Sequence, residues 1–333
     1  MNIRIFLFGS ILAVAILFSY TLISTAACGG GPTVFVCDTN NPNPDPVGVQ
    51  QLGNIGNLSI SVLPGAGIDT TILPGDDDGI ETGDGMNDIS VDNGSVIAED
   101  RGIRGGNNIE HVTLNNATIH SVTNDTISLL GGNNVINVMN SVLTSVESSI
   151  VLTGNDDDMV HISGSELKVL TASGNDIALR TGNGNDQATL ENSLLQGGNT
   201  TGLLTTAVSL SNGDDTLTIG SGVRLRGLRP GNVESFGIIQ CGDDFDTIIF
   251  AMAVPTSQLE EITAQIESKD PAGDNITINN LFYQWEDCEE LVPQLTGVFS
   301  TPVPTLSEWG LIFMAGLLGI AGYMVMRRRK VIA

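Results

Sequence analysis

Residues 177–190, Ile177-Ala-Leu-Arg-Thr-Gly-Asn-Gly-Asn-Asp-Gln-Ala-Thr-Leu190, contain the pattern that decides the fold. Alternating apolar residues lead into a turn of Gly, Asn and Asp, and a second alternating stretch follows. Alternation with a period of two is typical of half-buried strands. Gly supplies positive φ at such a turn, and Asn or Asp caps its own turn while tolerating the left-handed region. The stretch therefore predicts two short strands joined by a turn.

The same pattern returns between about Gly53 and Phe250. A period of roughly 20 to 30 residues suits one coil of a parallel β-solenoid, since each of about three strands takes ~5 residues and each turn a few more. A β-sandwich would not require one turn sequence to recur at one place in each period. We therefore predict an all-β fold over residues 53–250, a right-handed parallel β-helix of roughly seven to nine coils. The turn glycines that define the period, one in each repeat, are Gly83, Gly106, Gly132, Gly154, Gly182, Gly213 and Gly242.

The turns of these coils are strongly acidic. The phrases Gly83-Asp-Gly-Met-Asn-Asp-Ile89 and Gly182-Asn-Gly-Asn-Asp-Gln-Ala188 resemble the calcium-binding nonapeptide of RTX proteins. In that family tandem nonapeptides share each ion between successive turns, whereas here each phrase occurs once per coil. Hard oxygen ligands suit Ca²⁺, so two hypotheses stand: bound calcium, or a solvated acidic face with Asn-type turns. The candidate ligands would follow one edge of the solenoid: Asp84, Asp88, Asp156, Asp157, Asp158, Asp186, Asp214, Asp215, Asp243, Asp244 and Asp246.

The whole chain of 333 residues is acidic, with 38 Asp and Glu against 13 Lys and Arg and a net charge of −25. Between Cys28 and Val303 there are 37 acidic and 8 basic residues, so this part carries 37 − 8 = 29 negative charges. Such a surface repels phosphate backbones, which excludes nucleic acid as a partner and favours cations or basic surfaces.

The N-terminal segment, 1–27, has the layout of a secretory signal peptide. Arg4 precedes an apolar stretch over residues 5–23, and the segment ends in small residues, the last of which is Ala27. We therefore predict export, with cleavage between Ala27 and Cys28. Two alternatives stay open: an uncleaved membrane anchor, because the apolar stretch approaches spanning length, and a lipoprotein acylated at Cys28. Thr25 disfavours the lipoprotein, since such signals usually hold Leu at that position.

The other end of the chain combines a short motif, an apolar segment and a basic cluster. Residues 309–326, which begin with Trp309 at one interface, contain no charge and are just long enough to cross a bilayer. The cations at 327–330 should stay cytoplasmic, which places the body outside the inner membrane, as a signal peptide requires independently. We therefore predict a single C-terminal transmembrane helix, 309–326, within a tail that spans 301–333.

The order of Val303-Pro-Thr-Leu-Ser-Glu-Trp-Gly310, a short span and an Arg cluster resembles the IPTL-CTERM protein-sorting domain of Gram-negative bacteria. Val303 replaces the usual Ile, a change within one apolar class. The resemblance implies that an exosortase-type membrane enzyme processes the protein for the cell envelope or the extracellular matrix, with the tail anchored in the inner membrane at least beforehand. Whether the tail is cut or kept stays open, and an ordinary single-pass anchor is the alternative. The motif is carried by Val303, Pro304, Thr305, Leu306, Trp309, Gly310, Arg327, Arg328 and Arg329.

The four cysteines, Cys28, Cys37, Cys241 and Cys288, are spaced too irregularly for a zinc site. Outside the cytoplasm an even count favours disulfides, and we predict Cys28–Cys37 and Cys241–Cys288. Residues 28–52 would then be a linker with one Cys pair, since they are rich in Pro and Asn.

Residues 251–300 break the repeat, and we expect them to cover the open end of the solenoid as a small C-terminal α/β cap. The phrase Ser257-Gln-Leu-Glu260 has the form of a capping box, which predicts a helix from Ser257 to Ser268. The predicted Cys241–Cys288 disulfide would join this cap to the last coil.

Two classes of function remain. Parallel β-helices host polysaccharide lyases and hydrolases that use paired carboxylates or calcium. Here the excess of carboxylates lets no pair stand out, and no Ser or Cys nucleophile motif accompanies His111, His120 or His161. We therefore expect an exported, envelope- or matrix-associated structural or binding protein, with Ca²⁺ as the one candidate cofactor and polysaccharide or cations as candidate ligands. A carbohydrate-active β-helix enzyme is the alternative.

Overall fold

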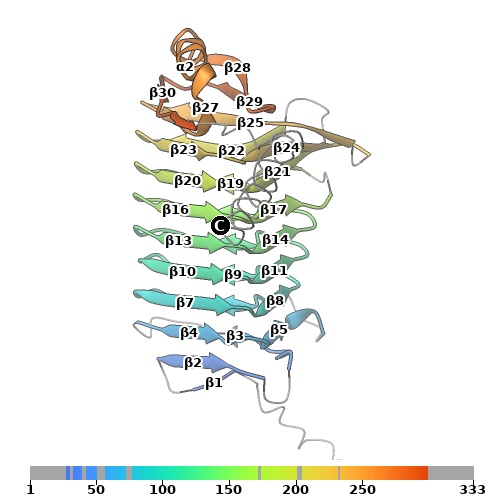
Figure 1. Cartoon of the computed structure of the whole chain (residues 1–333). Coiled ribbons are helices and arrows are strands. Elements are labelled where there is room, and N and C mark those ends of the chain that lie inside the picture. Colours follow the sequence, from blue (N-terminus) through green and yellow to red (C-terminus); the bar gives the residue numbers. More distant parts are fainter. Residues whose placement is uncertain are drawn as a thin grey trace, which may run out of the picture.

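The computed structural model describes residues 28–30, 33–39, 43–50, 57–72, 77–171, 174–200, 205–231 and 233–298 of the chain. The predicted signal peptide and the predicted sorting tail lie outside these residues. The described residues form a parallel β-solenoid of about 7 coils with a cap at its C-terminal end (Figure 1). None of the helices in these residues is long and apolar enough to cross a membrane.

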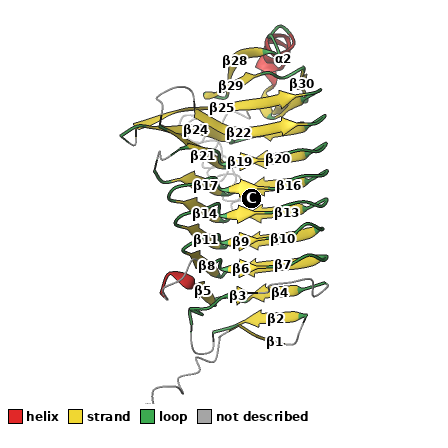
Figure 2. Ribbon diagram, turned by 180° about the vertical axis from the view of Figure 1, so that it is seen from behind, coloured by secondary structure: helices red, strands yellow, loops and turns green. Residues whose placement is uncertain are grey.

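The first face of the solenoid is an 11-stranded sheet, seen as a ladder of stacked strands in Figure 2. Its first strand, β1 (Cys28–Gly30), runs antiparallel to the second, and the later neighbours are parallel to one another. The later strands are β2 (Val34–Cys37), β4 (Ser59–Val62), β7 (Asn87–Asp92), β10 (Glu110–Asn115), β13 (Val135–Met139), β16 (Met159–Ser163), β20 (Gln187–Glu191), β23 (Thr216–Gly220), β26 (Thr247–Ala251) and β30 (Glu290–Pro293).

An 18-stranded sheet supplies the other two faces, because the long strand β25 pairs with strands of both. The second face holds β5 (Gly67–Asp69), β8 (Ser95–Ala98), β11 (Thr118–Ser121), β14 (Val142–Ser145), β17 (Glu166–Val169), β21 (Leu194–Asn199) and β24 (Arg224–Arg229), with β18 (Asn175–Asp176) beside β21. The third face holds β3 (Val49–Gln50), β6 (Ile80–Glu81), β9 (Ile103–Arg104), β12 (Ile127–Ser128), β15 (Val151–Leu152), β19 (Leu179–Arg180), β22 (Thr205–Asn212), β25 (Val233–Asp243) and β29 (Leu281–Glu286).

The core is a set of apolar columns that run along the solenoid axis. Within each strand, side chains alternate between the core and the surface, as in the buried–partly buried alternation of β4 and β8. The alternation fixes the register, since a slip of one residue would turn every apolar side chain outward. One fully buried column on the first face takes one side chain from each successive strand and consists of Val91, Leu114, Val138, Ile162, Leu190, Ile219 and Phe250.

The turn glycines that define the sequence period do not all stack at one position of the turn. Ser211 pairs with Gly242, and Asn183 pairs with Asn212, so Gly182 stands opposite Ser211. Gly213 instead lies against Gly184, because a Cβ added at Gly213 would come within 1.8 Å of the Gly184 carbonyl oxygen. Gly occurs at two places in this turn, separated by one residue, and the strand register decides which of them stack.

The N-terminal end of the solenoid is closed by residues that were predicted to be a linker. Three short strands of the first coils, β1, β2 and β3, lie within residues 28–52. The predicted disulfide between Cys28 and Cys37 is present and joins β1 to β2. The antiparallel β1 covers the edge of β2, so that the first parallel strand has a neighbour on both sides.

The C-terminal cap consists of β27 (Ala253–Pro255), the 3₁₀ turn η2 (Thr256–Gln258), α2 (Leu259–Glu267), β28 (Gly273–Ile278) and β31 (Thr296–Val298). The helix is present where it was predicted, and Ile262 and Ile266 are its buried residues. The predicted capping box is wrong: Ser257 lies in η2, and the N-cap residue of α2, Gln258, makes no side-chain capping bond.

Aromatic rings fill the last coil beneath the cap. The Phe250 ring centroid lies 5.8 Å from that of Tyr283 and 6.0 Å from that of Trp285, both in edge-on arrangements that aromatic pairs favour. The Tyr283 hydroxyl donates to the Val223 carbonyl at 2.9 Å, so its buried polar group is satisfied. The predicted Cys241–Cys288 disulfide is present and ties β25 to the chain that follows β29.

The turn packing predicts a large effect of one methyl group. Gly213 has φ +126° and its added Cβ would collide with the backbone of the neighbouring coil, so Gly213→Ala should lower the free energy of unfolding by about 3 kcal/mol. Gly231 has φ +81° but nothing within 4 Å of an added Cβ, so Gly231→Ala should cost only about 1 kcal/mol. Urea denaturation of both variants measures the difference. Equal losses would show that the coils are not packed as closely as described.

Candidate functional site

The structure divides the eleven predicted acidic ligands into two groups. Asp84 is partly exposed, and Asp88, Asp156, Asp157, Asp214, Asp243 and Asp244 are exposed. Asp158, Asp186, Asp215 and Asp246 are buried, each at the position just before a strand of the first face. These residues therefore do not form one solvated edge, and the buried group requires a separate explanation.

The buried aspartates form a hydrogen-bonded column along the axis. The Oδ1 atom of each accepts the backbone N–H of the equivalent residue one coil earlier. The N–H of Asp158 donates to Asp186 at 2.7 Å, that of Asp186 to Asp215 at 2.6 Å, and that of Asp215 to Asp246 at 3.0 Å. At the C-terminal end, the Asp246 N–H donates to Glu289 Oε2 at 2.7 Å. Each side chain thus satisfies a buried backbone donor at the corner of the preceding coil.

Three residues that the sequence did not single out occupy the same position in earlier coils. They are Asn87, Glu110 and Asn134, all buried. The Glu110 N–H donates to Asn134 Oδ1 at 2.9 Å, and the Asn134 N–H donates to Asp158 Oδ1 at 2.7 Å. The requirement at this position is an acceptor oxygen inside the corner, which Asn, Asp and Glu all supply. We call Glu110, Asp158, Asp186, Asp215 and Asp246 the carboxyl column.

The second oxygen of every carboxyl in this column is buried without a hydrogen-bond partner. Burial is the main reason that the pKa values of these groups rise, to about 7 for Glu110 and Asp158 and to about 6 for Asp186 and Asp246. The pKa of Asp215 rises to about 8, because the neighbouring Asp186 and Asp246 carboxylates add repulsion to burial. Burial therefore shifts every carboxyl of the column toward its protonated form, and the shift is largest at Asp215.

Asn134 shows what a neutral group does at this position. Its amide oxygen accepts from Glu110, while its NH₂ group donates to the Thr153 carbonyl at 3.1 Å. A protonated carboxyl has the same pair of functions, one acceptor and one O–H donor, whereas a carboxylate has only acceptors. Asn134 and the aspartates thus supply the same acceptor oxygen at the corner, but only Asn134 adds a donor bond, since the second carboxyl oxygens have no partner.

The exposed aspartates bridge neighbouring coils as well. Asp156 accepts the Gly132 N–H at 2.9 Å, and Asp157 accepts the Asn185 N–H at 2.8 Å. Asn side chains also stack as a ladder, since Asn183 donates to the Asn155 side chain at 2.6 Å. Within the described residues, no group of three or more His, Cys, Asp or Glu side chains is placed to hold a metal ion. Calcium binding stays a prediction.

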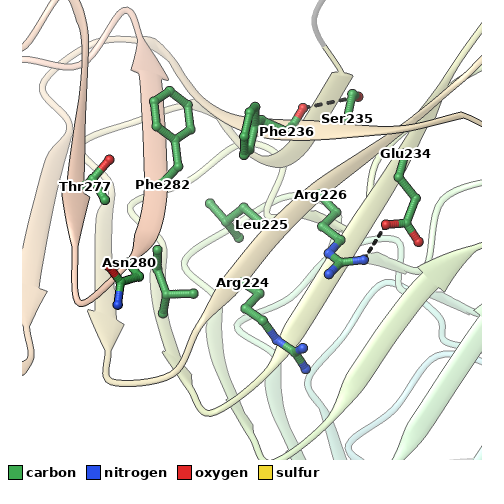
Figure 3. A pocket seen from close by; sticks show the side chains of 10 residues that line it. Arg224, Leu225, Arg226, Glu234, Ser235, Phe236, Thr277, Asn280 and Phe282 are labelled. Atoms are coloured by element: carbon green, nitrogen blue, oxygen red, sulfur yellow. Dashed lines mark hydrogen bonds and ion pairs between the residues drawn. The ribbon is translucent and has the colours of Figure 1, made fainter.

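A second candidate site lies where the long hairpin β24–β25 meets the hairpin β28–β29, a place that sequence reasoning missed. A cavity of about 570 Å³ opens there (Figure 3). Its lining consists of Arg224, Leu225, Arg226, Glu234, Ser235, Phe236, Thr277, Asn280, Leu281 and Phe282. The sequence does contain a trace of it, because three of the eight cations between Cys28 and Val303 fall in β24.

Two aromatic rings form one wall of this pocket. Phe236 is 61% exposed, and its ring centroid lies 4.7 Å from that of Phe282 at an interplanar angle of 46°. The pocket also holds an ion pair between Arg226 and Glu234, which lie on the paired strands β24 and β25. Among the described residues, Glu234 is the one carboxylate in the lining, and this part of the pocket does not hold the pair of carboxyls that glycoside hydrolysis uses.

The histidines lie in ordinary structural surroundings. The Nδ1 atoms of His111 and His120 lie 3.0 Å from Asp88 Oδ1 and 2.8 Å from Thr144 Oγ1, respectively. Partial burial lowers the pKa of His120. These contacts are made along strand columns of the solenoid surface, and no histidine lines the pocket.

Comparison with known proteins identifies the tail alone. Residues 301–329 match the IPTL-CTERM motif, which confirms the resemblance inferred from Val303 to Arg329. No curated protein and no solved structure matches the chain. The match covers the sorting segment only. No matched protein indicates a function for the solenoid.

The carboxyl column predicts a pH dependence of stability. Folding raises the pKa of Asp215 from 3.8 to about 8, so its stabilising contribution is complete below about pH 4 and is lost as the pH rises through 8. The melting temperature should therefore be higher at pH 5 than at pH 8. Asp215→Asn, neutral at every pH like Asn134, should raise the melting temperature at pH 8 by at least about 2 °C, or ~1 kcal/mol, and flatten the pH slope.

General repulsion between the acidic residues would also favour low pH, so a matched variant is needed. Asp243→Asn removes an exposed charge two positions after the Cys241 disulfide and should leave the slope nearly unchanged. A slope that responds equally to both substitutions would show that surface repulsion, and not the carboxyl column, sets the pH dependence.

One melting experiment decides the calcium prediction. Calcium bound to the folded state alone would raise stability by RT ln(1 + [L]/Kd), about 2.7 kcal/mol at a hundredfold excess over Kd. Melting is compared in EDTA, NaCl and CaCl₂ at matched ionic strength, and Asp156→Asn with Asp157→Asn should erase a true calcium increment. Equal melting temperatures in the two salts would leave the solvated acidic face as the explanation.

Proposed function

We propose that the protein is an exported structural and binding component of the cell envelope or extracellular matrix of a Gram-negative bacterium. The observation that carries this proposal is the joining of a stacked solenoid to an IPTL-CTERM motif, a sorting signal of exported proteins. The two disulfides support it, because such bonds persist in oxidising compartments outside the cytoplasm.

The N-terminal end of the solenoid supports cleavage of the signal peptide between Ala27 and Cys28. The backbone nitrogen of Cys28 donates to Asp45 Oδ2 at 2.9 Å, and Asp45 is fully buried. Cleavage would convert this nitrogen into an ammonium group beside a carboxylate, a charge-assisted hydrogen bond. The Cys28 sulfur is held in a disulfide with Cys37, which favours an ordinary signal peptide over a lipoprotein.

The length of the solenoid suits a role as a spacer that holds one end of the molecule away from the membrane. From β2 to β30 the first face makes nine steps of ~4.8 Å, or roughly 43 Å along the axis. In this proposal residues 309–326 cross the inner membrane, the cations at 327–330 stay in the cytoplasm, and an exosortase-type enzyme processes the tail. In this proposal the coils wind to the right, because that is the hand that parallel β-crossovers favour.

The sorting proposal predicts the behaviour of three tail variants. Pro304→Ala, Thr305→Ala and Trp309→Ala should each leave export intact but hold the protein unprocessed in the inner membrane, because they change the recognised motif and not the signal peptide. Fractionation and immunoblotting of the membrane, periplasm and medium measure this. Val303→Ile, which restores the usual family residue, is the matched control and should be processed normally. Normal processing of all three alanine variants would contradict the proposal.

A further inference from the structure

The pocket between β24 and β28–β29 is a positively charged site on a strongly acidic molecule. Arg224, Arg226 and Arg229 all lie on the short strand β24, while the body as a whole carries a large negative charge. Arg226 is paired with Glu234, but no ion pair of the described residues involves Arg224, which is exposed at the pocket. An unneutralised guanidinium in this setting favours an anionic ligand.

The aromatic wall of the pocket has no role in the core of the solenoid. Phe236 lies on the part of β25 that pairs with β24, and Figure 1 and Figure 2 both show this hairpin projecting beyond the stacked coils. Phe282 belongs to the β28–β29 hairpin, so the ring pair joins two segments far apart in the sequence. Figure 3 shows the two rings on one side of the pocket and the arginines on the other, with Leu225 between them. Exposed rings next to a cation are typical of binding sites.

We infer that this pocket binds a saccharide that carries a carboxylate. Arg224 would take the carboxylate through paired N–H donors, the geometry in which guanidinium binds carboxylates best. The C–H-rich face of a pyranose ring would lie on Phe236 and Phe282, and Ser235, Thr277 and Asn280 would meet its hydroxyl groups. The cavity of about 570 Å³ is of the size that takes a small ligand.

The charges around the pocket set the form of this ligand. The acidic body repels long polyanions, so a short acidic segment held locally at Arg224 is favoured over extended contact along the solenoid. The Arg226–Glu234 ion pair fixes the second guanidinium and leaves a carboxylate oxygen to accept from a sugar hydroxyl. The inference goes beyond the sorting function, since a purified chain should bind the sugar whether or not its tail is processed.

Binding is tested by titration calorimetry of the full chain in detergent with trigalacturonic acid, and with neutral galactotriose as the matched sugar. The acidic trimer should bind, the neutral one at least tenfold more weakly, and added NaCl should weaken the acidic trimer alone. Arg224→Gln should weaken trigalacturonate at least tenfold and remove the preference over galactotriose. Phe236→Ala should weaken both sugars.

Two control variants separate the pocket from general effects of charge and exposed rings. Phe245→Ala removes another ring that is 53% exposed but does not line the pocket, and Arg180→Gln removes a cation on the third face. Both should bind like the unchanged protein, and all four variants should keep its melting temperature. No binding of trigalacturonate, equal binding of galactotriose, equal losses in the control variants, or tighter binding of an acidic peptide or a nucleoside monophosphate would overturn the inference.

Discussion

Every other feature of this molecule depends on the backbone hydrogen bonds that join one coil to the next. In a parallel stack, each strand residue must find its equivalent in the neighbouring coil, because otherwise buried N–H and carbonyl groups stay unpaired. The strands of the first face keep this register over coils of unequal length, since the step from Val91 to Leu114 is shorter than the step from Ile219 to Phe250. The added residues therefore lie in the segments between strands, and the hairpin β24–β25 is one of them. The first face keeps its register throughout, whereas on the third face the register between β22 and β25 shifts once, between Thr206 and Val208.

The corners are the places where strand pairing alone cannot satisfy the backbone. There the chain uses side chains of the next coil as acceptors, and it accepts buried carboxyls to do so. A carboxyl with one oxygen bonded and the other unpartnered is an unfavourable group to bury as an anion, which is why it holds its proton more tightly. The carboxyls of the column are needed as acceptors for buried backbone N–H groups. Because they are buried there, their pKa values rise toward the neutral range.

The architecture was predictable from the sequence because alternation and turn residues are local properties. Ile177 to Leu190 alone indicates two strands and a turn, and recurrence of that pattern indicates a solenoid. The positions of the glycines did not predict the register of the coils, since Gly182 and Gly184 both fit the turn. The pairing of Asn183 with Asn212 shows which residue of the next coil lies opposite each of them. The acidic residues were recognised as a set, but Asp157 and Asp158 are neighbours with opposite exposure, a distinction that composition does not contain. The pocket depends on Phe236 meeting Phe282 across the cap, a contact between distant segments that no local pattern records.

From Glu110 to Asp246, the backbone N–H of each buried corner residue donates to the side chain of the following coil. At this buried corner the following coil supplies the acceptor, whereas at the exposed turn Asp157 accepts the N–H of Asn185 from the following coil, and Glu289 in the last coil ends the buried series. Without the following coil, the buried corner amide of each coil from Glu110 onward has no side-chain acceptor. A chain shortened at its C-terminal end would therefore lose the acceptor on which the buried corner of its last coil depends.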